Sequence, residues 1–336
     1  MELTNIREIQ IPASRVGLGT WAMGGVQWGG ADDDASVRTI HAALDLGINL
    51  IDTAPAYGFG HSEEVVGRAI AERGQRERVV LATKVGLERR GDALFRNGTR
   101  KQILEEVELS LMRLRTDYID LYQVHWPDPQ TPYEETAQAI LDLQREGKIR
   151  AIGVSNYSID AMQRFRSVAP LSSAQPPLNL FERQAEGDIL PWCRDNGIAT
   201  LTYGALCRGL LSGAIDEKTA FKGDDLRRTD PKFQPPRFTQ YLDAVRGLDR
   251  FARDRYARGV LALAVRWVLD HPGVSVALWG ARRPEELAPI NDVMGWSLDD
   301  EARAHIDAVL TGAVRDPVGP EFMAPPERPA EARSAA

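Results

Sequence analysis

The chain has little of what would mark a secreted or membrane-spanning protein. Its 336 residues include only two cysteines, Cys193 and Cys207, so a disulfide framework is not expected. The longest apolar run, near 260–265, is stopped by Arg266 and is too short to span a bilayer. The first residues also lack the charged and then apolar pattern of a signal peptide. We therefore expect a cytoplasmic protein with free thiols and no membrane partner.

Positive charge is also in short supply. The 41 lysines and arginines are outnumbered by 48 aspartates and glutamates, which gives a formal net charge of −7. A nucleic-acid partner would favour a basic face, so we expect none, although a local basic pocket for a phosphate remains compatible with this balance. The hydrophobic share of 43% and the charged share of 26% are typical of a globular protein with a sizeable core.

Motifs of several large enzyme classes are missing as well. The sequence contains no Gly-x-Ser-x-Gly elbow of a serine hydrolase. Its five histidines form no spaced ligand cluster, so we expect no metal site. The pattern Gly17-x-Gly19-x-x-Ala22 fits a dinucleotide-binding fingerprint, but that fingerprint should open a helix. Two Gly-Gly pairs follow it instead, which favours an open loop.

Strand-like runs alternate with helix-like runs through most of the chain. In a chain of this length, that alternation predicts an α/β fold, a (β/α)8 TIM barrel. We expect a single domain over 1–336, with an N-terminal β-hairpin, a barrel core over about 12–312 and a C-terminal tail over 313–336. The predicted barrel strands are Val16–Thr20, Ile48–Asp52, Val79–Lys84, Tyr118–His125, Ile149–Ser155, Ser172–Gln175, Ala199–Tyr203 and Val274–Trp279.

Local signals mark where helices begin and where the regular alternation breaks down. Thr99 and Thr131 each start a capping-box pattern, which predicts a helix directly after it. The stretch 212–238 is long, charged and proline-bearing, and a loop of this length in a compact domain is usually functional or mobile. The proline-rich tail 316–336 lacks periodicity, so it is either disordered or folded back over the barrel mouth.

Polar residues suited to catalysis fall at or just beyond the ends of successive predicted strands. Asp52 ends one strand and Tyr57 follows in a loop, while Lys84 and His125 end the next two strands. Strand ends of a barrel converge on one face, so these side chains are expected to share a pocket. A free tyrosine titrates near pH ~10 and is a poor acid at neutral pH.

A lysine cation beside Tyr57 would stabilise the phenolate and lower the pKa of the phenol. Asp52 would keep the charge of Lys84 in place, and His125 could donate a hydrogen bond to a substrate carbonyl or pass a proton. Each residue alone has an ordinary structural explanation, for example a solvated charge or a packed ring. Their combination at successive strand ends favours a catalytic site. The Ser62-Glu63 pair is expected to serve the start of the next helix instead.

These candidates, with the Gly58 and Ser62-Glu63 that follow Tyr57, resemble the catalytic tetrad of the aldo-keto reductase family in identity, order and strand position. The similarity extends over nearly the whole chain. Asp316–Phe322 resembles bacterial members related to general-stress and inositol-operon reductases. The resemblance implies an NADP(H)-dependent enzyme that reduces small aldehydes or ketones to alcohols, with Tyr57 as the proton donor. It leaves the oligomeric state open.

The resemblance also implies cofactor and substrate contacts. The segment 153–157 is similar to the one that holds the nicotinamide carboxamide, and 280–282 to the turn that receives the adenosine 2′-phosphate. Arg282 and Arg283 suit a phosphate and favour NADPH over NADH. The expected cofactor contacts are Thr20, Trp21, Asp52, Ser155, Asn156, Gln175, Tyr203, Gly204, Ala205, Leu206, Arg208, Gly280, Arg282 and Glu286. The expected substrate pocket comprises Trp21, Tyr57, His125, Trp126 and the loop 212–238.

Some positions depart from the commoner family pattern, and other functions stay open. Glu286 stands where a glutamine is usual and Pro289-Ile290 replaces a Glu-Asn pair, so the contacts to adenine are expected to differ. A non-catalytic NADPH-binding sensor or accessory subunit of the same fold is the main alternative, and the intact tetrad argues against it. A barrel glycosidase would need paired acids at strand ends, and Asp52 is the one acid clearly placed there.

Overall fold

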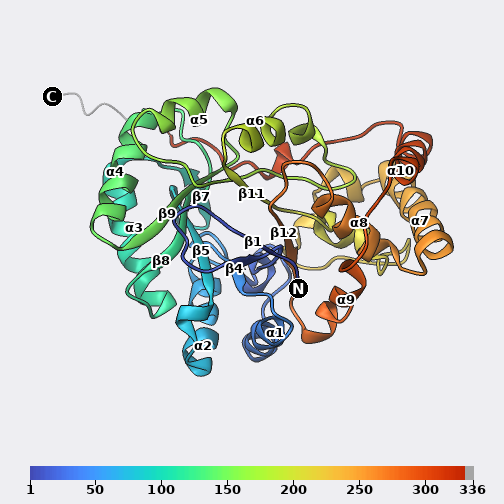
Figure 1. The fold of residues 1–336 in the computed structure, drawn as a ribbon, viewed down its shortest axis with the longest axis horizontal. Helices are drawn as coiled ribbons and strands as arrows, with labels where there is room; N and C mark the ends of the chain where they lie inside the picture. The colour runs from blue at the N-terminus through green and yellow to red at the C-terminus, as the bar shows by residue number, and fades with distance from the viewer. Residues whose placement is uncertain (330–336) are drawn as a thin grey trace.

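The computed structural model describes residues 1–329. Within that range, eight parallel strands close into a barrel surrounded by helices, which confirms the predicted fold (Figure 1). The barrel strands are β3 (Val16–Gly19), β4 (Leu50–Asp52), β5 (Val80–Val85), β8 (Ile119–Val124), β9 (Ile149–Ser155), β10 (Ser173–Gln175), β11 (Ala199–Thr202) and β12 (Val276–Gly280). They follow one another in chain order around the barrel, because β12 pairs with β3 and β9 pairs with β10.

The helices lie outside the strands and cover the barrel wall (Figure 1). Within residues 1–329, none of them combines the length and the apolar character that crossing a bilayer requires. They are α1 (Asp33–Asp45), α2 (His61–Arg73), α3 (Arg100–Leu114), α4 (Tyr133–Arg145), α5 (Ile159–Arg166), α6 (Ile189–Asp195), α7 (Arg237–Tyr256), α8 (Val260–Leu269), α9 (Ile290–Val293) and α10 (Asp300–Ala313).

Two small antiparallel hairpins complete the sheet structure. The N-terminal one joins β1 (Leu3–Thr4) to β2 (Ala13–Ser14), as expected, and its Ile6 packs into the barrel interior. The other joins β6 (Leu87–Arg90) to β7 (Ala93–Arg96) directly after β5. The first hairpin therefore lies at the amino-terminal end of the strands, and the second rises from their carboxyl end.

The two-residue period of the strands separates an apolar layer from a polar layer inside the barrel. Leu50 and Leu121 belong to the interior cluster that the N-terminal hairpin covers, whereas Ile51 packs outward against the helices. Two residues further along the same strands, Asp52 and Gln123 are also buried and face inward. The polar side chains thus lie at the carboxyl end of the barrel interior, and an apolar layer lies beneath them.

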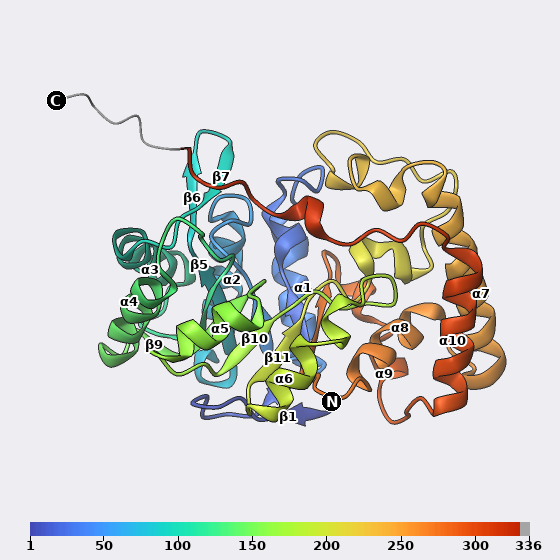
Figure 2. The same cartoon turned by 90° about the horizontal axis from the view of Figure 1, so that it is seen from above.

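The C-terminal segment folds back across the loops at the carboxyl end of the barrel, which decides between the two expectations for the tail over residues 316–329 (Figure 2). Arg96 donates hydrogen bonds of 2.7 and 3.0 Å to backbone carbonyl groups of this segment. Arg328 binds the buried carboxylate of Asp128 at 2.8 Å. Residues 330–336, which the predicted tail also included, lie outside the described part of the chain.

Candidate active site

The predicted tetrad comes together at the carboxyl end of three neighbouring strands. Asp52 ends β4, Lys84 lies near the end of β5, and His125 follows β8 directly. Tyr57 reaches over them from the loop after β4. The loop passes very close to the turn after β3. A Cβ atom on Gly58 would therefore collide with the backbone of Gly24. This close approach, with a φ of +64° at Gly58, requires glycine there.

Lys84 is the centre of the site. Its Nζ donates to Asp52 Oδ1 at 2.5 Å, to the Tyr57 hydroxyl at 3.1 Å and to the carbonyl of Thr53 at 3.1 Å. The side chains of Lys84 and Asp52 are only 1% and 3% exposed. Burial lowers the pKa of Lys84, but the attraction of Asp52 and Tyr57 outweighs it and the pKa is raised overall. The cation is therefore retained at neutral pH.

The Tyr57 phenol differs in one respect from the expectation. Lys84 lowers the pKa of Tyr57 as predicted, but burial of the phenol raises it by more, and Asp52 adds to the rise. The net shift is upward, so the prediction of a lowered pKa was wrong in its direction. The physical reason is that desolvation penalises the phenolate more than one paired cation stabilises it. Tyr57 consequently keeps its proton at neutral pH and is available as a donor.

His125 stands beside Tyr57, with the ring centroids 5.8 Å apart in an edge-on arrangement. Burial and the nearby Lys84 cation lower the pKa of His125 well below its ordinary value of 6.5. The imidazole is therefore neutral at physiological pH. A neutral ring has one N–H to donate, which favours the predicted hydrogen bond to a carbonyl over the alternative of passing a proton.

The Ser62-Glu63 pair was expected to serve the start of α2, and the structure shows a wider role. Both residues are fully buried. The Ser62 hydroxyl lies 2.8 Å from the Thr20 hydroxyl and 3.0 Å from that of Thr53, so it joins the ends of β3 and β4. Glu63 accepts from the hydroxyl of Thr83, the neighbour of Lys84, at 2.7 Å. These contacts fix the strand ends that carry the tetrad.

Aromatic rings cover the tetrad on one side. Trp21 stacks on Tyr57 with the centroids 6.1 Å apart, and Trp28 meets Trp21 edge-on at 5.3 Å. Trp28 was not among the predicted pocket residues. It lies between the two glycine pairs that follow the first strand, where no periodic pattern singles it out. Trp126 is half-buried and lies under the guanidinium of Arg96, on the side of the β6–β7 hairpin.

Next to the tetrad lies a cluster of amide and hydroxyl groups from the predicted nicotinamide site. Asn156 donates to the carbonyl of His125 at 3.0 Å and accepts from the Tyr203 hydroxyl at 2.9 Å. The Ser155 hydroxyl donates to the carbonyl of Gln175 at 2.9 Å, and the Gln175 amide donates to Asp52 at the same distance. These predicted residues are thus brought together. Thr20, in contrast, directs its hydroxyl to the carbonyl of Asp52 beneath the site.

Arg208 was predicted to bind a phosphate of the cofactor, but its guanidinium is already paired with other side chains. Its guanidinium binds the buried carboxylates of Glu182 at 2.7 Å and Asp230 at 2.5 Å. The Sδ atom of Met323, in the C-terminal segment, lies 3.9 Å from it. The predicted neighbours 204–206 lead into this turn from the end of β11. In this structure Arg208 joins the long loop to the C-terminal segment.

The turn after β12 holds the other predicted phosphate residues. The guanidinium of Arg282 donates to the carbonyl groups of Trp28 and Gly30 at 3.0 and 2.7 Å. The backbone N–H of Arg282 donates to the carboxylate of Glu286 at 2.8 Å. A carboxylate therefore occupies an N–H group that a phosphate of the cofactor could otherwise use.

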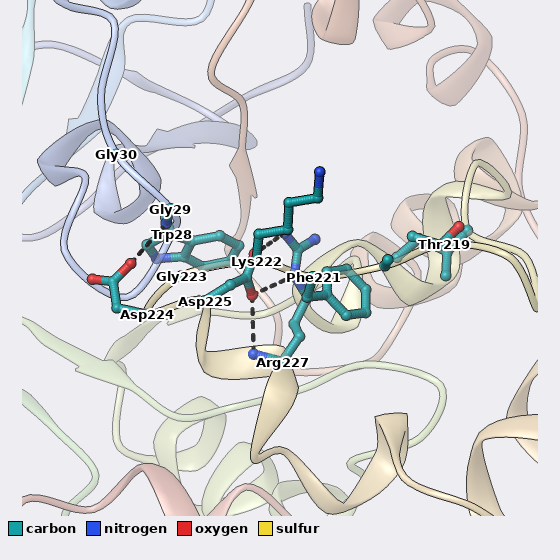
Figure 3. A pocket seen from close by; sticks show the side chains of 12 residues that line it. Trp28, Gly29, Gly30, Thr219, Phe221, Lys222, Gly223, Asp224, Asp225 and Arg227 are labelled. Atoms are coloured by element: carbon teal, nitrogen blue, oxygen red, sulfur yellow. Dashed lines mark hydrogen bonds and ion pairs between the residues drawn. The ribbon is translucent and has the colours of Figure 1, made fainter.

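A cleft of ≈ 750 Å³ lies between the loop after β3 and the long loop before α7 (Figure 3). The Asp224 carboxylate accepts hydrogen bonds from the backbone N–H groups of Gln27 and Gly29 at 2.7 and 3.1 Å. These bonds connect the long loop to the loop after β3. Arg227 lies over the Trp28 ring, 5.2 Å from its centroid. The volume is within the range of ligand pockets, and its lining combines aromatic rings and basic side chains with the carboxylates of Asp224 and Asp225.

Comparison with known proteins gives a consistent result. The model of the Aldo/keto reductase family matches residues 15–311. The chain is 59% identical to the aldo-keto reductase YhdN of Bacillus subtilis, over 98% of this chain and 99% of that protein. It is 38% identical to the NADH-specific methylglyoxal reductase of Escherichia coli, over 82% of this chain and 88% of that protein.

Solved structures resemble the chain over nearly its whole length. The glycerol dehydrogenase AKR11B4 from Gluconobacter oxydans superimposes with a TM-score of 0.86 at 53% identity, covering 96% of this chain and 99% of that one. An aldo-keto reductase from Klebsiella pneumoniae, solved in complex with NADPH, gives a TM-score of 0.70 at 30% identity, covering 92% of this chain and 96% of that one.

Proposed function

This chain belongs to the aldo/keto reductase family, and on that premise we propose that it is an NADP(H)-dependent enzyme that reduces an aldehyde or ketone to an alcohol, with Tyr57 as the proton donor. The observation that carries the proposal is the hydrogen-bonded chain from Asp52 through Lys84 to the Tyr57 hydroxyl. It places a neutral phenol next to a permanent cation, at the mouth of the barrel.

The residues present fit a nicotinamide nucleotide. Ser155, Asn156 and Gln175 bring amide and hydroxyl groups together beside Tyr57, and such groups are natural partners of a carboxamide. The cleft between Trp28 and the long loop has room for the diphosphate and its sugars. When bound, the reduced nicotinamide supplies the hydride for the carbonyl carbon.

The side chains of the tetrad then donate the proton and stabilise the negative charge that develops. His125, as a neutral donor, orients the substrate carbonyl through its N–H group. Tyr57 gives its proton to the carbonyl oxygen as negative charge develops there. The Lys84 cation stabilises the phenolate that remains, and Asp52 holds that cation in place. Solvent later returns a proton to Tyr57.

The experiment that tests this function is a substrate screen combined with direct cofactor binding. We expect NADPH to bind, followed by its oxidation, when small aldehydes such as methylglyoxal and glyceraldehyde are added. Reversal with NADP⁺ and glycerol should also be detectable, since the similar glycerol dehydrogenase is named for that substrate. Tight NADPH binding without turnover of any carbonyl would contradict an enzymatic role and would favour the sensor or accessory subunit.

A further inference from the structure

Gln123 lies inside the barrel directly below the proton-donating site, and neither the tetrad nor the expected cofactor contacts include it. It is on β8, two residues before His125, and it is fully buried. In the strand register it stands opposite Lys84 of β5 on one side and Gly153 of β9 on the other. It therefore occupies the same layer of the barrel as the Lys84 cation.

The Gln123 amide is directed at the second oxygen of the Asp52 carboxylate. Its Nε2 donates to Asp52 Oδ2 at 3.3 Å, while Oδ1 of the same carboxylate accepts from Lys84 at 2.5 Å. The Gln175 amide also donates to Oδ2, at 2.9 Å, and it approaches Gln123 Oε1 at 3.4 Å. A carboxylate held at one oxygen by neutral amides keeps its other oxygen aimed at the cation.

The neighbouring strand leaves room for this amide. A Cβ atom added to Gly153 would lie 2.7 Å from Cγ of Gln123, so a larger residue at 153 would displace the side chain. The contact between Gln123 and Asp52 thus depends on the close packing of β8 against β9 at Gly153, as well as on the conformation of the Gln123 side chain.

We propose that Gln123 is a positioning residue that acts through Asp52: its amide fixes the carboxylate so that Asp52 holds the Lys84 cation under the Tyr57 hydroxyl. The proposal rests on the proposed function, because it concerns the proton that Tyr57 delivers. Gln175 is also expected to contact the nicotinamide carboxamide, so its hydrogen bond to Asp52 is open to exchange when the cofactor binds. Gln123 faces the carboxylate from the barrel interior and retains its contact.

The first test replaces Gln123 by methionine, which keeps the length of the side chain and removes the donor. We expect kcat for carbonyl reduction to fall about tenfold, since a hydrogen bond to a charged group is lost. The alkaline limb of the pH profile should move to lower pH, because a less fixed Asp52 stabilises the Lys84 cation less. The dissociation constant of NADPH and the melting temperature should stay close to the wild-type values.

The matched control is Tyr122→Phe, on the same strand. The Tyr122 hydroxyl is buried and has no hydrogen-bond partner among the described residues, and its ring packs on the outer face of the barrel. This control should leave kcat and the pH profile unchanged. A Gln123→Met protein with wild-type kcat and an unmoved alkaline limb would overturn the proposal. So would a loss of kcat that leaves the limb in place, because that pattern indicates a structural role.

A second variant, Gln123→Glu, keeps the proposal testable if the methionine variant does not fold. A protonated carboxyl can donate to Asp52 as the amide does, whereas an ionised one repels it. We therefore expect activity close to wild type at acidic pH that is lost as the pH rises. Activity that instead follows the wild-type pH profile would contradict the proposal.

A measurement without cofactor or substrate separates this proposal from the proposed function. With tyrosine labelled with ¹³C at Cζ, the Tyr57 signal can be assigned by its absence from a Tyr57→Phe protein. In Gln123→Met, the titration of this signal should move to higher pH than in the wild type, because a Lys84 cation that is held less firmly lowers the pKa of the phenol less. If the wild type reduces no carbonyl but the signal moves, the proposed function fails and the positioning role stands. An unmoved signal overturns the positioning role.

Discussion

At the scale of single residues, the site depends on one buried cation and the groups that keep it charged. Lys84 contacts Asp52, Tyr57 and the carbonyl of Thr53, and each contact compensates part of the cost of burying an ammonium group. The phenol of Tyr57 stays protonated because its burial outweighs the effect of Lys84. The arrangement therefore suits proton donation at the moment when the carbonyl oxygen becomes basic.

At the nucleotide end of the site, Glu286 stands where a glutamine is usual in the family. Its carboxylate accepts from the backbone N–H of Arg282, next to the expected position of the adenosine 2′-phosphate. We expect Glu286→Gln to lower the dissociation constant of NADPH about threefold, because one repulsive charge near a surface phosphate is removed. NADH, which lacks that phosphate, should bind as before. Fluorescence titration of both nucleotides measures the difference.

The control for this prediction is Glu285→Gln, which removes the same charge from the neighbouring exposed position. It should change NADPH binding less than Glu286→Gln does. Equal effects of Glu286→Gln on NADPH and NADH would show that Glu286 does not face the 2′-phosphate.

The tetrad could be predicted from the sequence because Asp52, Lys84 and His125 lie at or next to the ends of successive strands and Tyr57 follows the first of these ends in a loop, and that spacing is visible without coordinates. Gln123 could have been found by the same rule, since it precedes His125 by two residues and so shares its face of the strand. The direction of the Tyr57 pKa shift could not be predicted. It depends on the depth of burial, which the surrounding loops and rings determine.

At the scale of secondary-structure elements, short-range signals were reliable where no distant residue competed. Thr99 caps α3 as its pattern predicts, accepting from the N–H of Gln102 at 3.4 Å. The capping box predicted at Thr131 was wrong, because α4 begins after Pro132 and has no side-chain cap there. The Thr131 hydroxyl donates to Asp128 instead. That carboxylate also binds the C-terminal segment, a contact that no local pattern reveals.

The contact between α3 and β5 contains a buried acid that should make stability depend on pH. Burial, together with the nearby Glu63, raises the pKa of Glu106 from 4.5 to about 8, although the N–H of Gly86 and the amide of Gln102 donate to it. Arg113, which pairs with Glu63, also lowers this pKa.

The sign follows from proton binding in the two states. Between pH ~4.5 and ~8 the folded protein holds a proton on Glu106 that the unfolded chain has released. The free energy of unfolding should therefore fall as the pH rises through this window, by on the order of 5 kcal/mol. In Glu106→Gln this part of the pH dependence should disappear, and the variant should be more stable than wild type at pH ~8.

Urea unfolding at a series of pH values measures this effect. Glu105→Gln, at the neighbouring exposed position of α3, is the matched control and should keep the wild-type pH dependence. If Glu106→Gln retained the full pH dependence of the wild type, another group would have to be responsible.

At the scale of the whole molecule, segments that are far apart in the sequence lie across the mouth of the barrel. The long loop before α7 is strapped to the loop after β3 by Asp224, and the C-terminal segment crosses above the barrel to Arg96 and Asp128 (Figure 2). Sequence patterns predicted the barrel because the alternation of strands and helices is repeated along the chain and each element has a local signal. They could not predict these long-range contacts, since each depends on a few residues that are distant in the sequence.

Arg208 lies where these segments meet, and its removal should affect the whole fold. It pairs with Glu182 and Asp230, and both carboxylates are fully buried. Breaking such a pair leaves an uncompensated buried charge. We expect Arg208→Met to lower the free energy of unfolding by about 3 kcal/mol without any nucleotide present.

Denaturant unfolding of the nucleotide-free protein measures this loss. Arg246→Met is the control, because Arg246 pairs with Glu217 and Asp243 at an exposed position, and its effect should be much smaller. A wild-type stability for Arg208→Met, combined with weaker NADPH binding, would contradict the structural role and would favour the predicted phosphate contact.

The most direct test of the central claim is a single-turnover measurement on Tyr57→Phe. The enzyme is loaded with NADPH and mixed rapidly with an aldehyde that the wild type reduces, and the loss of the reduced nicotinamide signal is followed. Because the proton donor is absent, we predict that the rate falls by at least about a hundredfold while NADPH binding is retained. Tyr122→Phe should react as the wild type does. A wild-type rate in Tyr57→Phe would contradict the account.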